Sequence, residues 1–286
     1  MSRFARPGRY LDVTVAGASR RVRVRDDGPR DAPALLVVHG FTGSSDWWDV
    51  VAEDLAADHR VVRFDLLGHG ATGGPSADAP EQTEVAAAVL EQLDVRDVTA
   101  VGHSFGADVA AGLAEAAERV TAVVLVCQAP DYADATLPRG HLLMTRPVVG
   151  TALLGAGHLL ALVAGGVSTV VRRPADPATR RLVRLAVADF RAVDAAMFTT
   201  VLVTRPRRMT RRPLDAQLRD AGKPALVLLG GRDHFYGDRS AGRYRAAGAR
   251  VEVIGDSGHS IQYEQPALVG RLLREFVGER RVGRRS

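Results

Sequence analysis

Uninterrupted runs of apolar residues constrain the fold of this chain most strongly. Residues 34–38 (ALLVV), 122–126 (AVVLV) and 225–229 (ALVLL) each hold five apolar residues in a row. A strand with one solvent-facing side alternates apolar and polar residues, whereas a strand buried on both faces does not. Segments with helical character separate these runs along the chain. The pattern therefore predicts a parallel sheet that is covered by helices on both faces.

Shorter segments extend this pattern to eight expected strands. They are residues 10–15, 21–25, 34–38, 60–65, 98–101, 122–126, 225–229 and 250–254. Helices are expected at residues 47–57, 81–93, 105–117, 239–247 and 265–277. Residues 21–25 (RVRVR) alternate strictly, which is typical of a half-buried edge strand, and Gly17 stands at the turn before them. The predicted fold class is α/β, a mostly parallel eight-stranded sheet flanked by helices.

The alternation of strands and helices stops near Pro130 and resumes after residue 220. Residues 131–220 contain helical-looking segments with glycine and proline interruptions. We therefore expect one core built from residues 1–130 and 221–286, with residues 131–220 inserted as a mostly helical unit. Residues 147–171 carry no formal charge and are long enough to span a bilayer, but they include five glycines, which weaken a helix. We interpret this run as pocket lining rather than membrane contact.

The amino-acid composition excludes several classes of protein. The chain has 286 residues, of which 46% are hydrophobic and 25% charged, so it is neither disordered nor fibrous. Its single cysteine, Cys127, excludes an intrachain disulfide and is expected to be a buried structural thiol. Residues 1–14 hold no long apolar run, so no signal peptide is indicated and a cytoplasmic location is expected.

The positive charge of the chain does not by itself indicate a polyanionic partner. The formal net charge is +5, and all but one of the 38 basic residues are arginine. Two dense runs, residues 205–212 and 280–285, are interpreted as solvated surface and a frayed tail. Aromatic residues make up 5% of the chain, too few for the basic, aromatic-rich face that binds nucleic acid. A small-molecule partner is expected instead.

A serine stands between two glycines where an expected strand gives way to an expected helix. The segment is Gly102-His103-Ser104-Phe105-Gly106 and fits the pattern G-x-S-x-G. Such a pentapeptide is weak evidence alone, but a sharp strand-to-helix turn would lift the Ser104 hydroxyl above the sheet. The glycines permit the tight backbone, and the helix N-terminus offers N–H groups to a developing oxyanion. Ser104 is therefore the candidate nucleophile.

A nucleophilic serine needs a base, and the base needs an acid to orient it. On this kind of fold the chain order is serine, acid, histidine. Asp233 and His259 follow the last two expected strands in that order. The carboxyl ends of parallel strands border one crevice, so these side chains are expected to meet Ser104 there. Asp131, after the sixth strand, is the rival for the acid.

At this point the chain resembles the α/β-hydrolase family over nearly its whole length. Residues 39–44 (HGFTGS) resemble that family's oxyanion loop, and the resemblance implies that the N–H groups of Phe41 and Phe105 form the oxyanion hole. Residues 65–70 (DLLGHG) resemble its D-x-R-G-x-G loop, with Leu67 in place of arginine. The insertion at 131–220 resembles the helical cap of many members. Branches that use an aspartate nucleophile are disfavoured because residue 104 is a serine.

Several further residues are candidates for contact with substrate. They are His39, Gly40, Trp47, His103 and His158. His39 and His103 adjoin the expected site and would also shape its loops. Of the two tryptophans at 47 and 48, one is expected in the core and the other at the crevice. No histidine pair has metal-ligand spacing with a carboxylate, and no phosphate-binding glycine motif follows a strand, so neither a metal nor a cofactor is expected.

These observations lead to one functional expectation with alternatives. The chain is expected to be a serine hydrolase that cleaves an ester, lactone or thioester of a mainly apolar small molecule through an acyl-enzyme on Ser104. The alternatives are a C–C-bond hydrolase, a cyclase or an acyltransferase that uses the same serine. A hydrolase-like ligand receptor without catalysis is a further alternative. The oligomeric state and the substrate are left open.

Overall fold

A computed structural model gives the structure of the chain for residues 8–133, 135–136, 141–146, 177–193, 195–233, 235 and 239–283. One eight-stranded sheet has the order β1-β2-β4-β3-β5-β6-β7-β8. The strands are β1 (Arg9–Val15), β2 (Ala18–Asp27), β3 (Ala34–Val38), β4 (Arg60–Phe64), β5 (Val98–His103), β6 (Val120–Val126), β7 (Ala225–Gly230) and β8 (Arg250–Ile254). The pairs β1–β2 and β2–β4 are antiparallel and all others are parallel. The expected mostly parallel sheet is confirmed.

The placement of β2 differs from the expectation of an edge strand. β2 lies between β1 and β4, and β1 forms the edge. Two of the three alternating arginines of β2, Arg23 and Arg25, face carboxylates rather than water, while Arg21 is exposed. Arg23 bonds to Asp65 and Asp46, and the nearly buried Arg25 bonds to Asp46 and Asp49. Strict alternation is typical of a strand with one solvent-facing side, but here ion pairs neutralise two of the three arginine positions.

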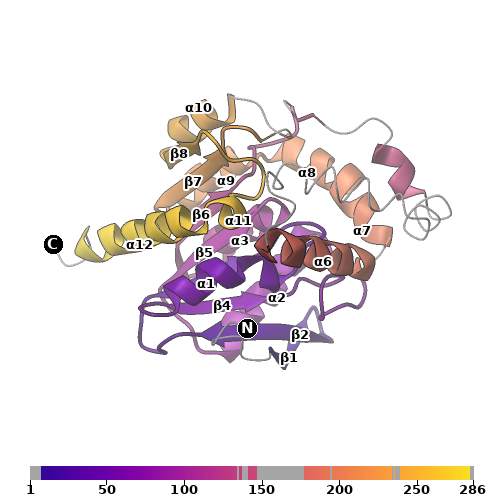
Figure 1. The fold of residues 1–286 in the computed structure, drawn as a ribbon, viewed down its shortest axis with the longest axis horizontal. Coiled ribbons are helices and arrows are strands. Elements are labelled where there is room, and N and C mark those ends of the chain that lie inside the picture. Colours follow the sequence, from indigo (N-terminus) through magenta and orange to yellow (C-terminus); the bar gives the residue numbers. More distant parts are fainter. Residues whose placement is uncertain are drawn as a thin grey trace.

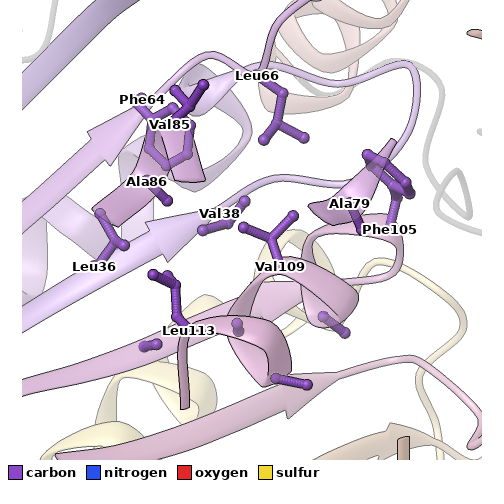
Figure 2. Packing of buried hydrophobic residues seen from close by; sticks show 14 of the residues in the cluster. Leu36, Val38, Phe64, Leu66, Ala79, Val85, Ala86, Phe105, Val109 and Leu113 are labelled. Atoms are coloured by element: carbon purple, nitrogen blue, oxygen red, sulfur yellow. The ribbon is translucent and has the colours of Figure 1, made fainter. Parts of the chain in front are cut away.

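Helices cover both faces of the sheet, as the apolar runs predict. The helices of the core are η1 (Ser45–Trp48, a 3-10 turn), α1 (Asp49–Leu55), α2 (Ala79–Gln92), α3 (Phe105–Ala116), α10 (Arg239–Ala246), α11 (Ile261–Glu264) and α12 (Pro266–Gly283). Alternate residues of β3 enter two different buried clusters: Leu36 and Val38 pack with α2 and α3, while Leu35 and Val37 pack with α1 and α12. Figure 2 shows the first of these clusters.

The described part of the insertion between β6 and β7 is helical. Its elements are η2 (His141–Thr145, a 3-10 helix), α6 (Pro177–Ala192), α7 (Ala195–Thr199), the π-helix η3 (Thr200–Thr204), α8 (Arg205–Arg211) and α9 (Leu214–Ala221). In Figure 1, α7 and α8 lie at the opposite end of the molecule's long axis from the C-terminus. Buried residues of α6 to η3, such as Phe190 and Met197, belong to the same cluster as α2 and α3.

The uncharged run at residues 147–171 lies outside the described residues. Within the residues that the structure does describe, no helix combines the length and apolarity that crossing a membrane requires. α9, the last helix before β7, contacts α3 directly. The insertion is thus joined to the core both through the contact of α9 with α3 and through the shared apolar cluster.

Candidate active site

Ser104 occupies the sharp turn between β5 and α3. Its backbone has φ 51° and ψ −114°, a conformation that a non-glycine residue adopts only at a cost of about 1–3 kcal/mol. A Cβ on Gly102 would lie 2.1 Å from the Gly106 carbonyl oxygen, and a Cβ on Gly106 would lie 2.5 Å from the His39 carbonyl oxygen. Only glycine fits at either position. The G-x-S-x-G pattern is therefore required by the close approach of β3, β5 and α3.

His259 and Asp233 are in direct contact. The Nδ1 atom of His259 lies 2.7 Å from Oδ2 of Asp233, and both side chains are largely buried. A carboxylate only accepts hydrogen bonds, so Nδ1 carries the proton and Nε2 is left as the acceptor atom of the ring. The Phe235 N–H donates to Oδ1 of Asp233, and the Phe235 ring packs edge-on against the imidazole, with ring centroids 4.8 Å apart. Each carboxylate oxygen of Asp233 therefore accepts a hydrogen bond, one from His259 and the other from Phe235.

Asp131 has different partners. Its carboxylate accepts a hydrogen bond from Arg243 at 2.7 Å and another from the Ala133 N–H at 2.8 Å. Arg243 also binds Asp215. The structure thus brings Asp233, rather than Asp131, to the imidazole of His259.

The two histidines next to the expected site bond to the backbone. His39 accepts from the Leu66 N–H at Nε2, 3.0 Å away, and donates from Nδ1 to the Gly40 carbonyl at 2.8 Å. His103 Nε2 lies 2.7 Å from the carbonyl oxygen of His259 and donates to it. Burial lowers the pKa of His39, and burial with the nearby His259 lowers the pKa of His103 to about 3. Burial thus favours the neutral form of both rings, and their hydrogen bonds hold loops together; contact with substrate remains a prediction for them.

The loop after β3 lies close to the nucleophile. A Cβ on Gly40 would be 3.1 Å from the Cβ of Ser104. The Phe41 ring packs against Phe198 of α7, with ring centroids 5.0 Å apart. Phe105 is the first residue of α3, where a backbone N–H has no acceptor within the helix. The loop and the helix N-terminus therefore flank Ser104, as an oxyanion hole at Phe41 and Phe105 would require.

Trp47 contacts the insertion through a carboxylate that the sequence did not single out. Its indole Nε1 donates to Oδ2 of Asp189 in α6 at 2.8 Å, and Ser44 Oγ donates to the same oxygen at 2.7 Å. Burial raises the pKa of Asp189 to about 6. Trp48 is fully buried in the core, as expected for one of the pair. No periodicity or motif marks Asp189, because its partners lie more than 140 residues away.

The arginine run at 205–212 is not the solvated surface that its composition suggests. Arg205 is 1% exposed, and Arg208 is partly buried and binds Asp78 and Asp108. Residues 205, 208 and 209 share the inner face of α8, while Arg207 and Arg211 are exposed. Counting arginines in a window misses this helical spacing, which is the signal that could have found the buried ones.

Three other expectations concern the surroundings of the site. Cys127 is buried, as expected, with Sγ 3.6 Å from the Gly258 carbonyl oxygen, and burial raises the pKa of its thiol. His158 lies outside the described residues. Among the described residues, no three histidine, cysteine, aspartate or glutamate side chains are grouped as a metal site would need.

Comparison with known proteins is decisive about the family. The family model of the alpha/beta hydrolase fold matches residues 33–266. This chain belongs to the alpha/beta hydrolases. A Bacillus subtilis protein provisionally assigned as a 2-succinyl-6-hydroxy-2,4-cyclohexadiene-1-carboxylate synthase is 26% identical over 276 residues, which are 93% of this chain and 98% of that protein.

Solved structures of other alpha/beta hydrolases have the same fold. A hydrolase from Pseudomonas aeruginosa is 25% identical, with a TM-score of 0.76 over 96% of this chain and 99% of that one. A Burkholderia cenocepacia protein provisionally described as an aryl esterase is 24% identical, with a TM-score of 0.78 over 95% of this chain and 98% of that one. This alpha/beta hydrolase therefore has relatives that are similar along almost their entire length.

Proposed function

We propose that this alpha/beta hydrolase is a serine hydrolase that cleaves an ester, lactone or thioester of a mainly apolar small molecule. The observation that carries the proposal is the bond between His259 Nδ1 and Asp233 Oδ2, which leaves Nε2 as the basic atom of the imidazole. A second observation supports it: Ser104 is held in the strained conformation that exposes a nucleophile at a strand-to-helix turn. The esterases and hydrolases among the structural neighbours agree with this class of reaction.

The proposed reaction has two half-reactions. Ser104 Oγ attacks the acyl carbonyl carbon while His259 Nε2 takes the hydroxyl proton. The N–H groups of Phe41 and Phe105 donate to the resulting oxyanion. His259 then gives its proton to the departing alcohol or thiol, which leaves an acyl-enzyme on Ser104. A water molecule attacks this ester, His259 takes the water proton and returns it to Ser104, and the carboxylic acid leaves.

Asp233 keeps the imidazole in the productive tautomer throughout and stabilises the imidazolium that forms transiently. Residues 131–220 are proposed to form the cap over this site. Its uncharged run at residues 147–171 supports an apolar acyl or alcohol group in the substrate. The contact of α7 with the oxyanion loop, through Phe198 and Phe41, is consistent with this position.

A second candidate function has its own support. The similarity to the Bacillus subtilis protein assigned as a carboxylate synthase spans nearly all of both chains. As the second candidate we propose a synthase reaction of this chain, in which Ser104 and His259 together act as a base and no ester forms on the serine. The discriminating observation is an acyl group on Ser104, which hydrolysis requires and proton abstraction does not.

The experiment combines a fluorophosphonate probe with rapid-quench mass spectrometry of the intact protein on a p-nitrophenyl ester. We expect the probe to label Ser104, and the quench to trap the protein with one acyl group added. Ser104→Ala should abolish both, whereas Ser240→Ala, at a buried serine of α10, should change neither. A protein that the probe labels at Ser104, but that neither turns over the ester nor accumulates an acyl group, would favour the second candidate. Labelling that survives Ser104→Ala would overturn the assignment of the nucleophile.

A further inference from the structure

Arg205, a buried arginine of α8 in the insertion, contacts the backbone of Ser104, the proposed nucleophile. The Arg205 guanidinium donates from Nη2 to the Ser104 carbonyl oxygen at 3.2 Å and to Gln128 Oε1 at 2.8 Å. Its Nε donates to Asp108 Oδ2 at 2.6 Å, and its Nη1 donates to the Tyr132 hydroxyl at 2.7 Å. One side chain of α8 thus bonds to the turn at Ser104, to the helix after that turn and to the segment after β6.

The local sequence accounts for the way Arg205 reaches this position. Pro206 has no N–H, and its ring would crowd the carbonyl of Leu202 in an α-helix. The helix widens to a π turn just before it, in which the Arg205 N–H donates to the Thr200 carbonyl five residues back. Each residue added to a turn rotates the rest of the helix by about 100°. Such turns are frequent at functional sites, and this one precedes the side chain that binds the nucleophile's backbone.

The main chain of Ser104 needs support, because its φ of 51° is unfavourable for serine. On one side, the Ser104 N–H donates to the Val126 carbonyl at 2.9 Å. On the other side, the Ser104 carbonyl accepts from the Ala107 N–H at 3.0 Å and from Arg205. Among the described residues, Arg205 is the side chain that binds this carbonyl, and it is itself only 1% exposed.

Arg205 also compensates a charge that would oppose catalysis. Asp108 lies in the first turn of α3 and is 3% exposed. An unneutralised carboxylate there would repel the negative charge that develops beside the N-terminus of the same helix. Arg205 binds both Asp108 oxygens, and Arg208 binds one of them as well. The helix N-terminus therefore keeps its favourable field for an oxyanion.

We propose that Arg205 is a positioning residue of the active site, through which the insertion holds Ser104 in its reactive conformation and neutralises Asp108. The inference rests on the proposed serine hydrolase function. Arg205 does not touch the substrate; it acts through the backbone of Ser104. The expected consequence is an effect on the rate of the chemical step rather than on substrate binding.

The test compares Arg205→Met, Arg205→Lys and a matched control, Arg60→Met. Arg60 is also nearly buried, binds Asp26 through two nitrogens and donates to the Leu93 carbonyl. It begins β4 and so lies at the end of the strands away from Ser104. The measurements are kcat and KM on a p-nitrophenyl ester, the rate of fluorophosphonate labelling, and the melting temperature of each full-length variant.

We expect Arg205→Met to lower both kcat and the labelling rate roughly 100-fold, with KM within about threefold of the wild-type value. Arg205→Lys keeps the charge but loses the planar fork, so about a tenfold loss is expected. Arg60→Met should lower the melting temperature and leave kcat unchanged. Because the loss of a buried arginine can also impair folding, kcat is referred to the fraction that is folded by near-UV circular dichroism. If none of the Arg205→Met protein is folded, the proposal is tested on Arg205→Lys alone.

Three results would overturn the proposal. Wild-type kcat in folded Arg205→Met or Arg205→Lys, with a loss of stability like that of Arg60→Met, would make Arg205 merely structural. A change confined to KM would make it a substrate-binding residue. A wild-type protein that the probe does not label at Ser104 would refute the serine hydrolase function itself, a failure that is distinguishable because it does not involve any variant.

Discussion

The carboxylate of Asp189 in α6 lies 2.8 Å from the indole nitrogen of Trp47, which stands 142 residues earlier in the 3-10 turn η1 after β3. The same carboxylate oxygen accepts a bond from Ser44. The insertion and the proposed oxyanion loop are therefore joined by one buried acid. Its pKa is raised to about 6, chiefly by burial, and Asp65 and Asp46 raise it further.

This pKa predicts how Asp189 affects stability. The folded protein holds the proton more tightly than the unfolded chain, so the contribution of this group is most favourable below about pH 4 and is lost as the pH rises to 6. Asp189→Asn keeps an oxygen acceptor and removes the charge. We compare the free energy of unfolding of the variant with that of the wild type. This difference should be about 2 kcal/mol more favourable to the variant at pH 8 than at pH 4. Urea titrations of both proteins at the two pH values measure this, and an equal difference at both would contradict it.

The orienting acid is tested by two matched substitutions. Asp233→Asn should lower kcat by about 10⁴-fold with little change in KM, because the amide favours the wrong tautomer of His259. Asp131→Asn removes a carboxylate of the neighbouring loop that binds Arg243, and it should leave kcat within a few-fold of wild type. Steady-state kinetics on one ester suffice. If the two effects are exchanged, the acid lies after β6.

Gly106 is predicted to be irreplaceable for a steric reason. An alanine Cβ would lie 2.5 Å from the His39 carbonyl oxygen and 2.6 Å from that of Val38, and both are backbone atoms of β3 or its end. We expect Gly106→Ala to destabilise the protein by about 1–3 kcal/mol and to reduce probe labelling of Ser104. A Cβ added at Gly242 in α10 would meet nothing within 4 Å, so Gly242→Ala should be neutral or stabilising by about 0.5–1 kcal/mol. Thermal unfolding distinguishes the pair.

The uncharged run at residues 147–171 predicts a preference for apolar acyl groups. Each methylene that is buried contributes about 0.8 kcal/mol, so kcat/KM should rise about three- to fourfold per carbon until the pocket is full. A series of p-nitrophenyl esters from acetyl upward measures this. Leu160→Asp should lower kcat/KM for long acyl chains more than kcat/KM for the acetyl ester. It should not alter probe labelling of Ser104. A steady decline of wild-type activity from acetyl onward would indicate a small polar pocket instead.

The strands and the loops that carry the candidate site could be predicted because their signals are local. Five-residue apolar runs identify strands that are buried on two faces, and the structure confirms that Leu35 and Leu36 enter different clusters. The glycines around Ser104 indicate a close backbone approach, which for Gly106 is to the carbonyl oxygens of Val38 and His39. The expectation for β2 was wrong because alternation shows that one face is polar, but it does not show whether that face meets water or carboxylates.

The sequence by itself determined the order of strands and helices, the serine at a strand-to-helix turn, and the acid and histidine placed after two late strands. These follow from short-range periodicity and from the requirement that parallel strands end at one edge. Only the tertiary structure decided that Asp233 rather than Asp131 meets His259, that Asp189 binds Trp47, and that Arg205 lies behind Ser104. Each of these contacts joins residues 26 to 142 positions apart. The first contact depends on how the loops after β7 and β8 meet, and the other two depend on how helices of the insertion pack against the core, which local patterns do not encode.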